Sequence, residues 1–217
     1  VYNNDFIVAG YVRFTTKLIP KYSFINNTFH ARSLNEAITS QQPMFELRNI
    51  AHFKNNVFSN IAYLFSSPGQ QPASFQFNAS WRVEPGFVMD STNVTGYPVF
   101  TDINYGFISG YWPITQTSSL LYNSKFQKQS PFIDKGDPLI FDVNGSRSDP
   151  GYYGGPNGES YAYLDTAPMP PFWSILKEDS ARNSLNGRWE RAYDPDVERY
   201  QFYVDTTDYG GNFPSLY

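Results

Sequence analysis

The segment DVNGSRSDPGYYGGPNGES, residues 142–160, holds the densest group of side chains that could bind a ligand. Oxygen-bearing side chains occupy alternate positions at its start: Asp142, Asn144, Ser146 and Ser148. Calcium loops place oxygen ligands at this spacing, with a glycine at the sixth position and a glutamate at the twelfth. Here those two positions hold Arg147 and Tyr153, and the arginine would put a positive charge beside the ion. We therefore expect no metal and no cofactor.

The same segment also presents tyrosines beside flexible glycines. Tyr152, Tyr153 and Tyr161 could stack on the apolar C–H faces of sugar rings. The alternative is turn chemistry, because Asn-Gly, Asp-Pro and Gly-Gly pairs are common turn signals. A connection of this length in a compact domain is usually functional or mobile. The sequence predicts a long exposed contact loop that includes these three tyrosines.

Catalytic signatures are scarce. The two histidines, His30 and His52, belong to no recognisable motif, and packed or surface positions are the more frequent roles for such residues. Paired carboxylates could cleave sugars, and Glu84 and Glu190 are candidates because Trp189 could raise the pKa of its neighbour. A solvated surface position explains both acids more simply. The sequence favours a non-enzymatic protein and predicts no catalytic residue.

Asparagine supplies four sequons for N-glycosylation, at Asn26, Asn78, Asn93 and Asn144. A chain this rich in asparagine, serine and threonine would contain two or three by chance. The sequence therefore marks these residues as candidate glycosylation sites, and it expects Asn78 on a polar strand face.

Composition excludes several functional classes. There is no cysteine, so disulfides, thiolate zinc sites and cysteine nucleophiles are ruled out. The net charge is -4 and basic runs are lacking, which argues against direct nucleic-acid binding. No apolar stretch reaches membrane-spanning length. Charged residues make up only 17% of the chain and aromatic residues 18%, which suggests neutral surfaces suited to assemblies or to neutral glycans.

The elements that must position these residues are mainly strands. Residues 74–84 alternate, with Phe77 and Trp81 expected inside and Gln76 and Arg82 outside, as in a half-buried antiparallel strand. Similar segments, rich in aromatic or β-branched residues, separate at Gly, Pro, Asn and Asp. They are 6–18, 97–101, 105–111, 119–126, 138–143, 161–164 and 198–205.

Two segments carry helical signals. Residues 48–65 place Ile50, Phe53, Val57 and Ile61 at helical spacing, which favours a helix, although a hairpin turning at residues 54–56 is the alternative. Ser33 followed by Glu36 could cap a short helical turn over residues 33–39. The sequence shows no internal repeat of constant length.

Many short strands with long loops predict one mainly β domain over residues 1–217: an antiparallel β-sandwich or jelly roll with one or two short helices. Residues 206–217 form a possible exchanged C-terminal arm. Its apolar anchors would be Tyr209, Phe213, Leu216 and Tyr217.

The function expected from these features is that of a structural subunit in an extracellular or virion-type, capsid-like assembly. Its partners would be copies of itself or related subunits, at an extracellular or virion-surface location. The alternative is a secreted carbohydrate-binding module or glycoside hydrolase of sandwich fold that recognises neutral glycans.

Overall fold

The structure is a computed structural model of the 217-residue chain. All structural statements below concern the residues that it describes. These are residues 1–8, 14–15, 21–31, 44–47, 50–61, 63–65, 71–102, 123–165, 172–179, 184–190 and 199.

The described residues form strands and turns, with no helix among them. The strands are β1 (Asp5–Val8), β2 (Phe14–Thr15), β3 (Lys21–Ile25), β4 (Thr28–Ala31), β5 (Phe45–Glu46), β6 (Ile50–Lys54), β7 (Val57–Ile61), β8 (Ser74–Gln76), β9 (Ala79–Val83), β10 (Val94–Thr95), β11 (Phe100–Asp102), β12 (Asn123–Phe126), β13 (Phe172–Asp179) and β14 (Ser184–Glu190).

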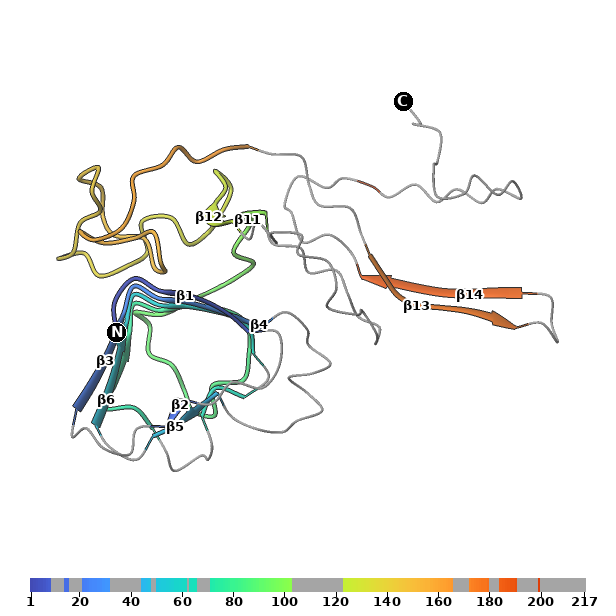
Figure 1. The fold of residues 1–217 in the computed structure, drawn as a ribbon, viewed down its shortest axis with the longest axis horizontal. Coiled ribbons are helices and arrows are strands. Elements are labelled where there is room, and N and C mark those ends of the chain that lie inside the picture. Colours follow the sequence, from blue (N-terminus) through green and yellow to red (C-terminus); the bar gives the residue numbers. More distant parts are fainter. Residues whose placement is uncertain are drawn as a thin grey trace, which may run out of the picture.

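The first ten strands wind into a parallel β-solenoid (Figure 1). One sheet has the order β1-β4-β7-β9-β10, a second has β3-β6-β8, and a third pairs β2 with β5. Every pairing within these sheets is parallel, and a parallel bridge from Phe45 to Phe65 extends the third sheet. From β1 to β9 the chain visits the three sheets in a fixed cyclic order, so each circuit forms one coil stacked on the coil before it, and β10 then pairs with β9 in the same sheet.

The predicted antiparallel sandwich or jelly roll is therefore wrong. Alternating burial shows that a strand has one buried face, but it does not give the direction of the neighbouring strand. In a solenoid, each short strand buries one face in the coil interior and pairs with the equivalent strand one circuit later. The only strand pairs that are antiparallel in the described part are β11–β12 and β13–β14.

The helix predicted over residues 48–65 is also wrong, and so is the alternative hairpin. The chain does turn at Asn55 and Asn56, but β6 and β7 on either side enter different sheets. The single strand predicted over residues 74–84 likewise bends at Phe77 and Asn78 into β8 and β9. Each of these two segments contains a sharp corner between two strands. The apparent period is misleading because it combines residues from both strands.

Aromatic rings stacked from coil to coil fill the solenoid interior. The rings of Phe6, Phe29 and Phe58 lie in one stack, with centroids 4.9 and 5.2 Å apart. Phe24 and Phe53 form a second stack at 4.9 Å. These spacings are close to the separation of neighbouring strands in a sheet, because the parallel register puts equivalent residues directly above one another.

Outside the solenoid, residues 127–165 form a long ordered loop, and β13–β14 form a hairpin that Figure 1 draws apart from the coils. The segments predicted as strands at 138–143 and 161–164 contain no strand, apart from an isolated bridge between Phe141 and Arg147. The predictions for residues 33–39, 105–111, 198–205 (apart from residue 199) and the 206–217 arm lie outside the described residues.

Candidate functional site: an asparagine corner and the loop docked on it

One corner of the solenoid is built from the same two-residue turn in successive coils. Its pairs are Asn3–Asn4, Asn26–Asn27, Asn55–Asn56, Phe77–Asn78 and Thr92–Asn93. The first residue of the first four pairs has a positive φ, between 45° and 56°. Asparagine tolerates this left-handed conformation better than most residues, whereas a phenylalanine there is unusual. The positive φ turns the chain sharply from one sheet into the next.

The second residue of each pair forms a continuous hydrogen-bonded ladder. The backbone N–H and Nδ2 of Asn27 both donate to Oδ1 of Asn56, at 3.0 Å each. The same two donors of Asn56 reach Oδ1 of Asn78 at 2.9 Å, and those of Asn78 reach Oδ1 of Asn93 at 3.0 and 3.3 Å. Because these amides are buried, the ladder satisfies polar groups that would otherwise destabilise the interior.

The first residues of the pairs instead bind the loop of residues 127–165. Nδ2 of Asn3 donates to the carbonyl oxygens of Tyr152 and Gly154, at 2.8 Å each. Nδ2 of Asn26 donates to the carbonyl oxygen of Asp149 at 3.1 Å. Together with Asn55, described next, asparagines at equivalent positions of three coils hold one loop.

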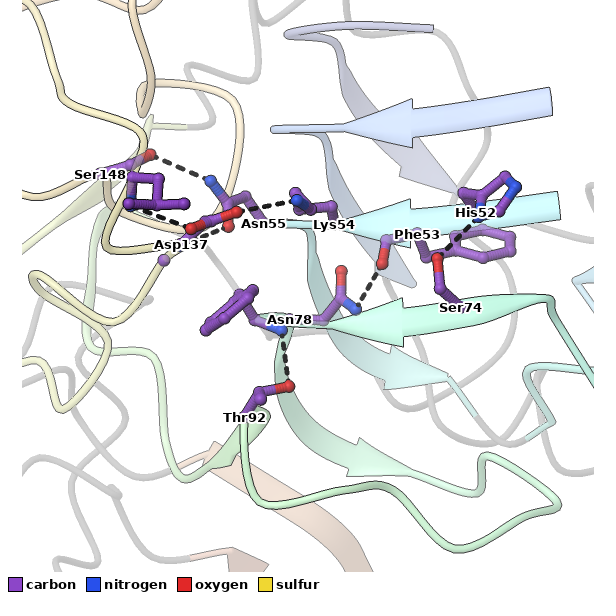
Figure 2. A network of polar contacts seen from close by, with 12 residues as sticks. His52, Phe53, Lys54, Asn55, Ser74, Asn78, Thr92, Asp137 and Ser148 are labelled. Atoms are coloured by element: carbon purple, nitrogen blue, oxygen red, sulfur yellow. Dashed lines mark hydrogen bonds and ion pairs between the residues drawn. The ribbon is translucent and has the colours of Figure 1, made fainter.

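Asn55 and Lys54 extend these contacts to the start of the loop (Figure 2). Oδ1 of Asn55 accepts the backbone N–H of Asp137 at 2.7 Å, and its Nδ2 donates to Oγ of Ser148 at 3.3 Å. Nζ of Lys54 forms a 2.8 Å ion pair with Asp137. The pKa of Asp137 lies below its usual value, although burial opposes the shift, because Lys54 and the N–H of Leu139 stabilise the carboxylate.

The backbone of the loop also contacts the coils closely at Gly151. The N–H of Gly151 donates to the carbonyl oxygen of Asn55 at 2.7 Å, and the N–H of Tyr152 donates to Oγ1 of Thr28 at 3.0 Å. Gly151 has a φ of 102°, and a Cβ there would lie 2.9 Å from Oγ1 of Thr28. Only glycine therefore fits this contact without displacement.

Two carboxylates hold the loop in shape. Asp142 accepts the N–H of Asp149 at 3.1 Å and that of Gly155 at 2.5 Å. Asp149 accepts the N–H of Asp134 at 2.7 Å and the hydroxyl of Tyr163 at 2.9 Å. Burial raises the pKa of Asp142, and it raises that of Asp149 to about 7, with the charge of Asp142 adding to the second shift.

A pKa near neutrality is often a mark of a general acid or base. Here each carboxylate already accepts hydrogen bonds from N–H or O–H groups of its own loop. Both acids therefore stabilise the conformation of the loop. The other oxygen-bearing side chains of the proposed calcium pattern are also used locally. Oδ1 of Asn144 accepts the N–H of Ser146 at 2.9 Å, and Oγ of Ser148 donates to the carbonyl oxygen of Asp149 at 3.0 Å.

The three tyrosines predicted for the contact loop do lie together. Tyr152, Tyr153 and Tyr161 make successive edge-to-face contacts, with ring centroids 4.7 and 5.4 Å apart. Nζ of Lys125 lies 5.0 Å from the ring centroid of Tyr153 and forms a 3.1 Å ion pair with Glu159. Tyr152 is exposed, whereas Tyr153 and Tyr161 are half-buried, so the cluster reaches the surface at Tyr152 and packs within the loop at the other two rings.

The structure separates the four sequons. Asn26 and Asn78 are buried and hydrogen-bonded, so the expected polar strand face for Asn78 is wrong, and neither amide is accessible to a glycosyltransferase in the folded chain. Asn93 is a half-buried member of the ladder. Asn144 lies exposed at a turn, and it remains the one sequon of the four whose side chain is solvent-exposed.

The remaining candidates do not come together. His30 is buried inside the solenoid, and desolvation lowers its pKa to about 3. His52 contacts Oγ of Ser74 at 2.8 Å, Glu84 is exposed, and the side chain of Glu190 lies outside the described residues. Within the described ranges no three His, Cys, Asp or Glu residues cluster as metal ligands would. Nor does the described part contain a helix with the length and apolar character needed to cross a lipid bilayer.

Comparison of the chain with protein-family models, with curated proteins and with solved structures gives no match.

The asparagine corner was missed at the sequence level, although a signal for it exists. The segments VYNNDF, FINNTF and FKNNVF, at residues 1–6, 24–29 and 53–58, are versions of one six-residue motif. FQFNAS, at residues 75–80, is a weaker fourth copy. The copies are unevenly spaced, and a search for a constant repeat length passes over them. Read as a repeat, they would have indicated a solenoid.

Proposed function

We propose that the chain is a non-enzymatic structural subunit of an extracellular or virion-type assembly, with the solenoid as a rigid scaffold. The proposal rests on the observation that the polar side chains make structural hydrogen bonds within the chain. The residues that could do chemistry, above all the corner asparagines, Asp142 and Asp149, hold the ladder and the loop together.

This construction suits a rigid scaffold. Each coil is tied to the next by backbone pairing, by aromatic stacking and by the ladder, and the docked loop spans three coils. Local opening of one coil would therefore break interactions on both sides of it. Resistance to unfolding along the whole solenoid is what a scaffold requires.

The docked loop offers a contact surface for other subunits. Leu139, Phe141 and Val143 alternate along one short segment and are 84%, 57% and 57% exposed. Apolar side chains gathered in this way commonly mark protein contacts. We propose that this segment, together with the neutral surface of the chain, contacts related subunits.

The test is the native size of the protein. Light scattering coupled to size-exclusion chromatography should show an assembly, and the double variant Leu139→Ser/Phe141→Ser should shift it toward free subunit. The control Val88→Ser removes an exposed apolar side chain that lies outside residues 127–165, and it should leave the size unchanged. A monomeric wild-type chain at high concentration would refute the proposal.

A second candidate function is recognition of neutral glycans, which the surface edge of the tyrosine cluster favours. Exposed Tyr152 beside half-buried Tyr153 offers aromatic surface that could stack on a sugar ring. Affinity electrophoresis in polysaccharide gels would test it. Retardation that is lost in Tyr152→Ala would support glycan binding, and equal mobility with and without polysaccharide would exclude it for the glycans used.

A further inference from the structure

The asparagine ladder has a direction, and its two ends differ. In each step, the N–H and Nδ2 of one asparagine donate to Oδ1 of the asparagine in the following coil. Nδ2 also reaches back to the carbonyl oxygen that lies three residues before the previous ladder asparagine. Asn27, Asn56, Asn78 and Asn93 reach in this way to Val1, Phe24, Phe53 and Phe75, respectively.

The C-terminal end of the ladder is closed by the chain itself. Nδ2 of Asn93 donates to Oδ1 of Asp90 at 2.9 Å, and its backbone N–H donates to the carbonyl oxygen of Asp90 at 3.2 Å. Oδ1 of Asp90 also accepts the N–H of Thr92 at 2.9 Å. The donors that would continue the ladder are therefore already used in a local turn.

The N-terminal end is open in the described structure. Asn4 donates to Asn27 as the pattern requires, but Oδ1 of Asn4 has no donor among the described residues. β1 is the edge strand of its sheet. The carbonyl oxygen of Asn4 accepts the N–H of Thr28, so it points toward β4. Because successive residues of a strand point their backbone groups to opposite sides, the N–H groups of Asp5 and Ile7 point toward the open edge. Val1 and Tyr2, beside that edge, are 48% and 57% exposed.

We propose that this first coil is an acceptor surface for one further parallel coil, whose corner carries an asparagine after a residue of positive φ. The asparagine supplies the N–H and Nδ2 donors for Oδ1 of Asn4. Its flanking strands pair with β1 and with residues 1–2, the start of the neighbouring sheet. The repeat in this chain defines the occupant, an apolar residue three positions before the asparagine and an aromatic residue two positions after it, as in FINNTF.

The closed C-terminal end decides against another copy stacked end to end. In such a stack, Asn93 of the other copy would have to donate hydrogen bonds to Oδ1 of Asn4. The N–H and Nδ2 of Asn93 already donate to Asp90. The occupant is therefore a coil with free donors at its corner. This inference rests on the solenoid geometry and deepens the proposed scaffold role, because it specifies the direction in which the scaffold extends.

The test is binding of a synthetic coil to the whole chain. The peptide KYSFINNTFHA copies residues 21–31, and its control replaces the asparagine equivalent to Asn27 by alanine. Hydrogen exchange should show that the first peptide protects the amides of Asp5 and Ile7. The control peptide should bind at least about tenfold more weakly, as expected for loss of about 1.4 kcal/mol of hydrogen bonding.

Two results would overturn the inference. The first is that saturating peptide leaves hydrogen exchange at the amides of Asp5 and Ile7 unchanged, or that both peptides slow this exchange equally. The other is end-to-end filaments of the chain alone that Asn93→Ala abolishes, since the occupant would then be another copy. Both readouts are independent of the Leu139 and Phe141 surface, so they can fail or succeed separately from the proposed assembly function.

Discussion

At the scale of single residues, position within the corner pair decides what an asparagine does. The second residue of each pair faces its equivalents in neighbouring coils, whereas the first faces the docked loop. The same side chain thus serves two different interfaces, and the backbone conformation selects between them. Substitutions at the two positions should therefore fail in different ways.

Asn56→Ala should destabilise the whole solenoid. The side chain of Asn56 accepts two hydrogen bonds from Asn27 and donates to Phe24 and Asn78, so its loss leaves several buried polar groups unpaired. We expect the free energy of unfolding to fall by at least about 3 kcal/mol. Urea denaturation measures this, with Asn157→Ala at an exposed position as the control, expected within about 0.5 kcal/mol of wild type. Equal losses in the two variants would contradict the ladder.

Phe77 should tolerate substitution by asparagine. Its φ is 56°, in the position that Asn3, Asn26 and Asn55 occupy in other coils, and its side chain is only half-buried. Relief of backbone strain, about 1 kcal/mol, should offset much of the lost apolar burial. Phe75→Ala, in the aromatic core, should instead cost about 3–5 kcal/mol in thermal unfolding experiments. A Phe77→Asn cost as large as that of Phe75→Ala would show that Phe77 is a core residue.

At the scale of elements, the docked loop depends on a close approach at Gly151. Gly151→Ala adds a methyl group 2.9 Å from Oγ1 of Thr28, in addition to the strain of a positive φ. Gly145→Ala is the matched control, because Gly145 has a φ of 87° but no atom within 4 Å of the added Cβ. Both variants should therefore carry the strain of about 1–2 kcal/mol, and only Gly151→Ala should also loosen the loop from the coils.

Limited proteolysis and hydrogen exchange across residues 134–155 would measure that loosening. We expect faster exchange at Asp137 and Tyr152 in Gly151→Ala, because their N–H groups bond to Asn55 and Thr28. Exchange there should stay close to that of wild type in Gly145→Ala. If the two variants exchange alike, the loop is not held by its contact at Gly151.

At the scale of the whole molecule, two buried titratable groups oppose each other as the pH falls. Asp149 has a raised pKa of about 7, so the native state gains a proton first and becomes relatively more stable on acidification from pH 7 toward 4. His30 has a lowered pKa of about 3, so the unfolded state gains its proton first and native stability is lost below pH 6.5. Between pH 6.5 and 4 the two contributions largely cancel.

Asp149→Asn should reveal the contribution of His30 to the pH dependence of stability. Without the aspartate, stability should fall as the pH is lowered from 6.5 to 5, by up to about 1.4 kcal/mol per pH unit. The raised pKa values of Asp5 and Asp142 oppose that fall, so the slope is an upper bound. Denaturant midpoints at several pH values would measure it. A variant whose pH profile parallels that of wild type would show that Asp149 titrates normally.

The sequence by itself determined that the chain is β-rich, that strands lie within residues 6–18 and 74–84, and that Tyr152, Tyr153 and Tyr161 share a loop. These features depend on local composition: aromatic and β-branched runs, and turn residues between them. The turn at Asn55 and Asn56 falls only within the alternative hairpin, and the favoured helix runs through it, because the helical spacing of apolar residues is unbroken there.

Only the tertiary structure decided that the strands pair in parallel, that the corner asparagines form a ladder, and that Asn26 and Asn78 are buried. Burial patterns are the same for a strand that pairs with its hairpin neighbour and for one that pairs with the next coil. Choosing between them depends on which long-range pairing satisfies the most buried amides and stacks the most rings. These contacts join residues 20 to 30 positions apart, such as Phe29 and Phe58. No local window of sequence includes both partners.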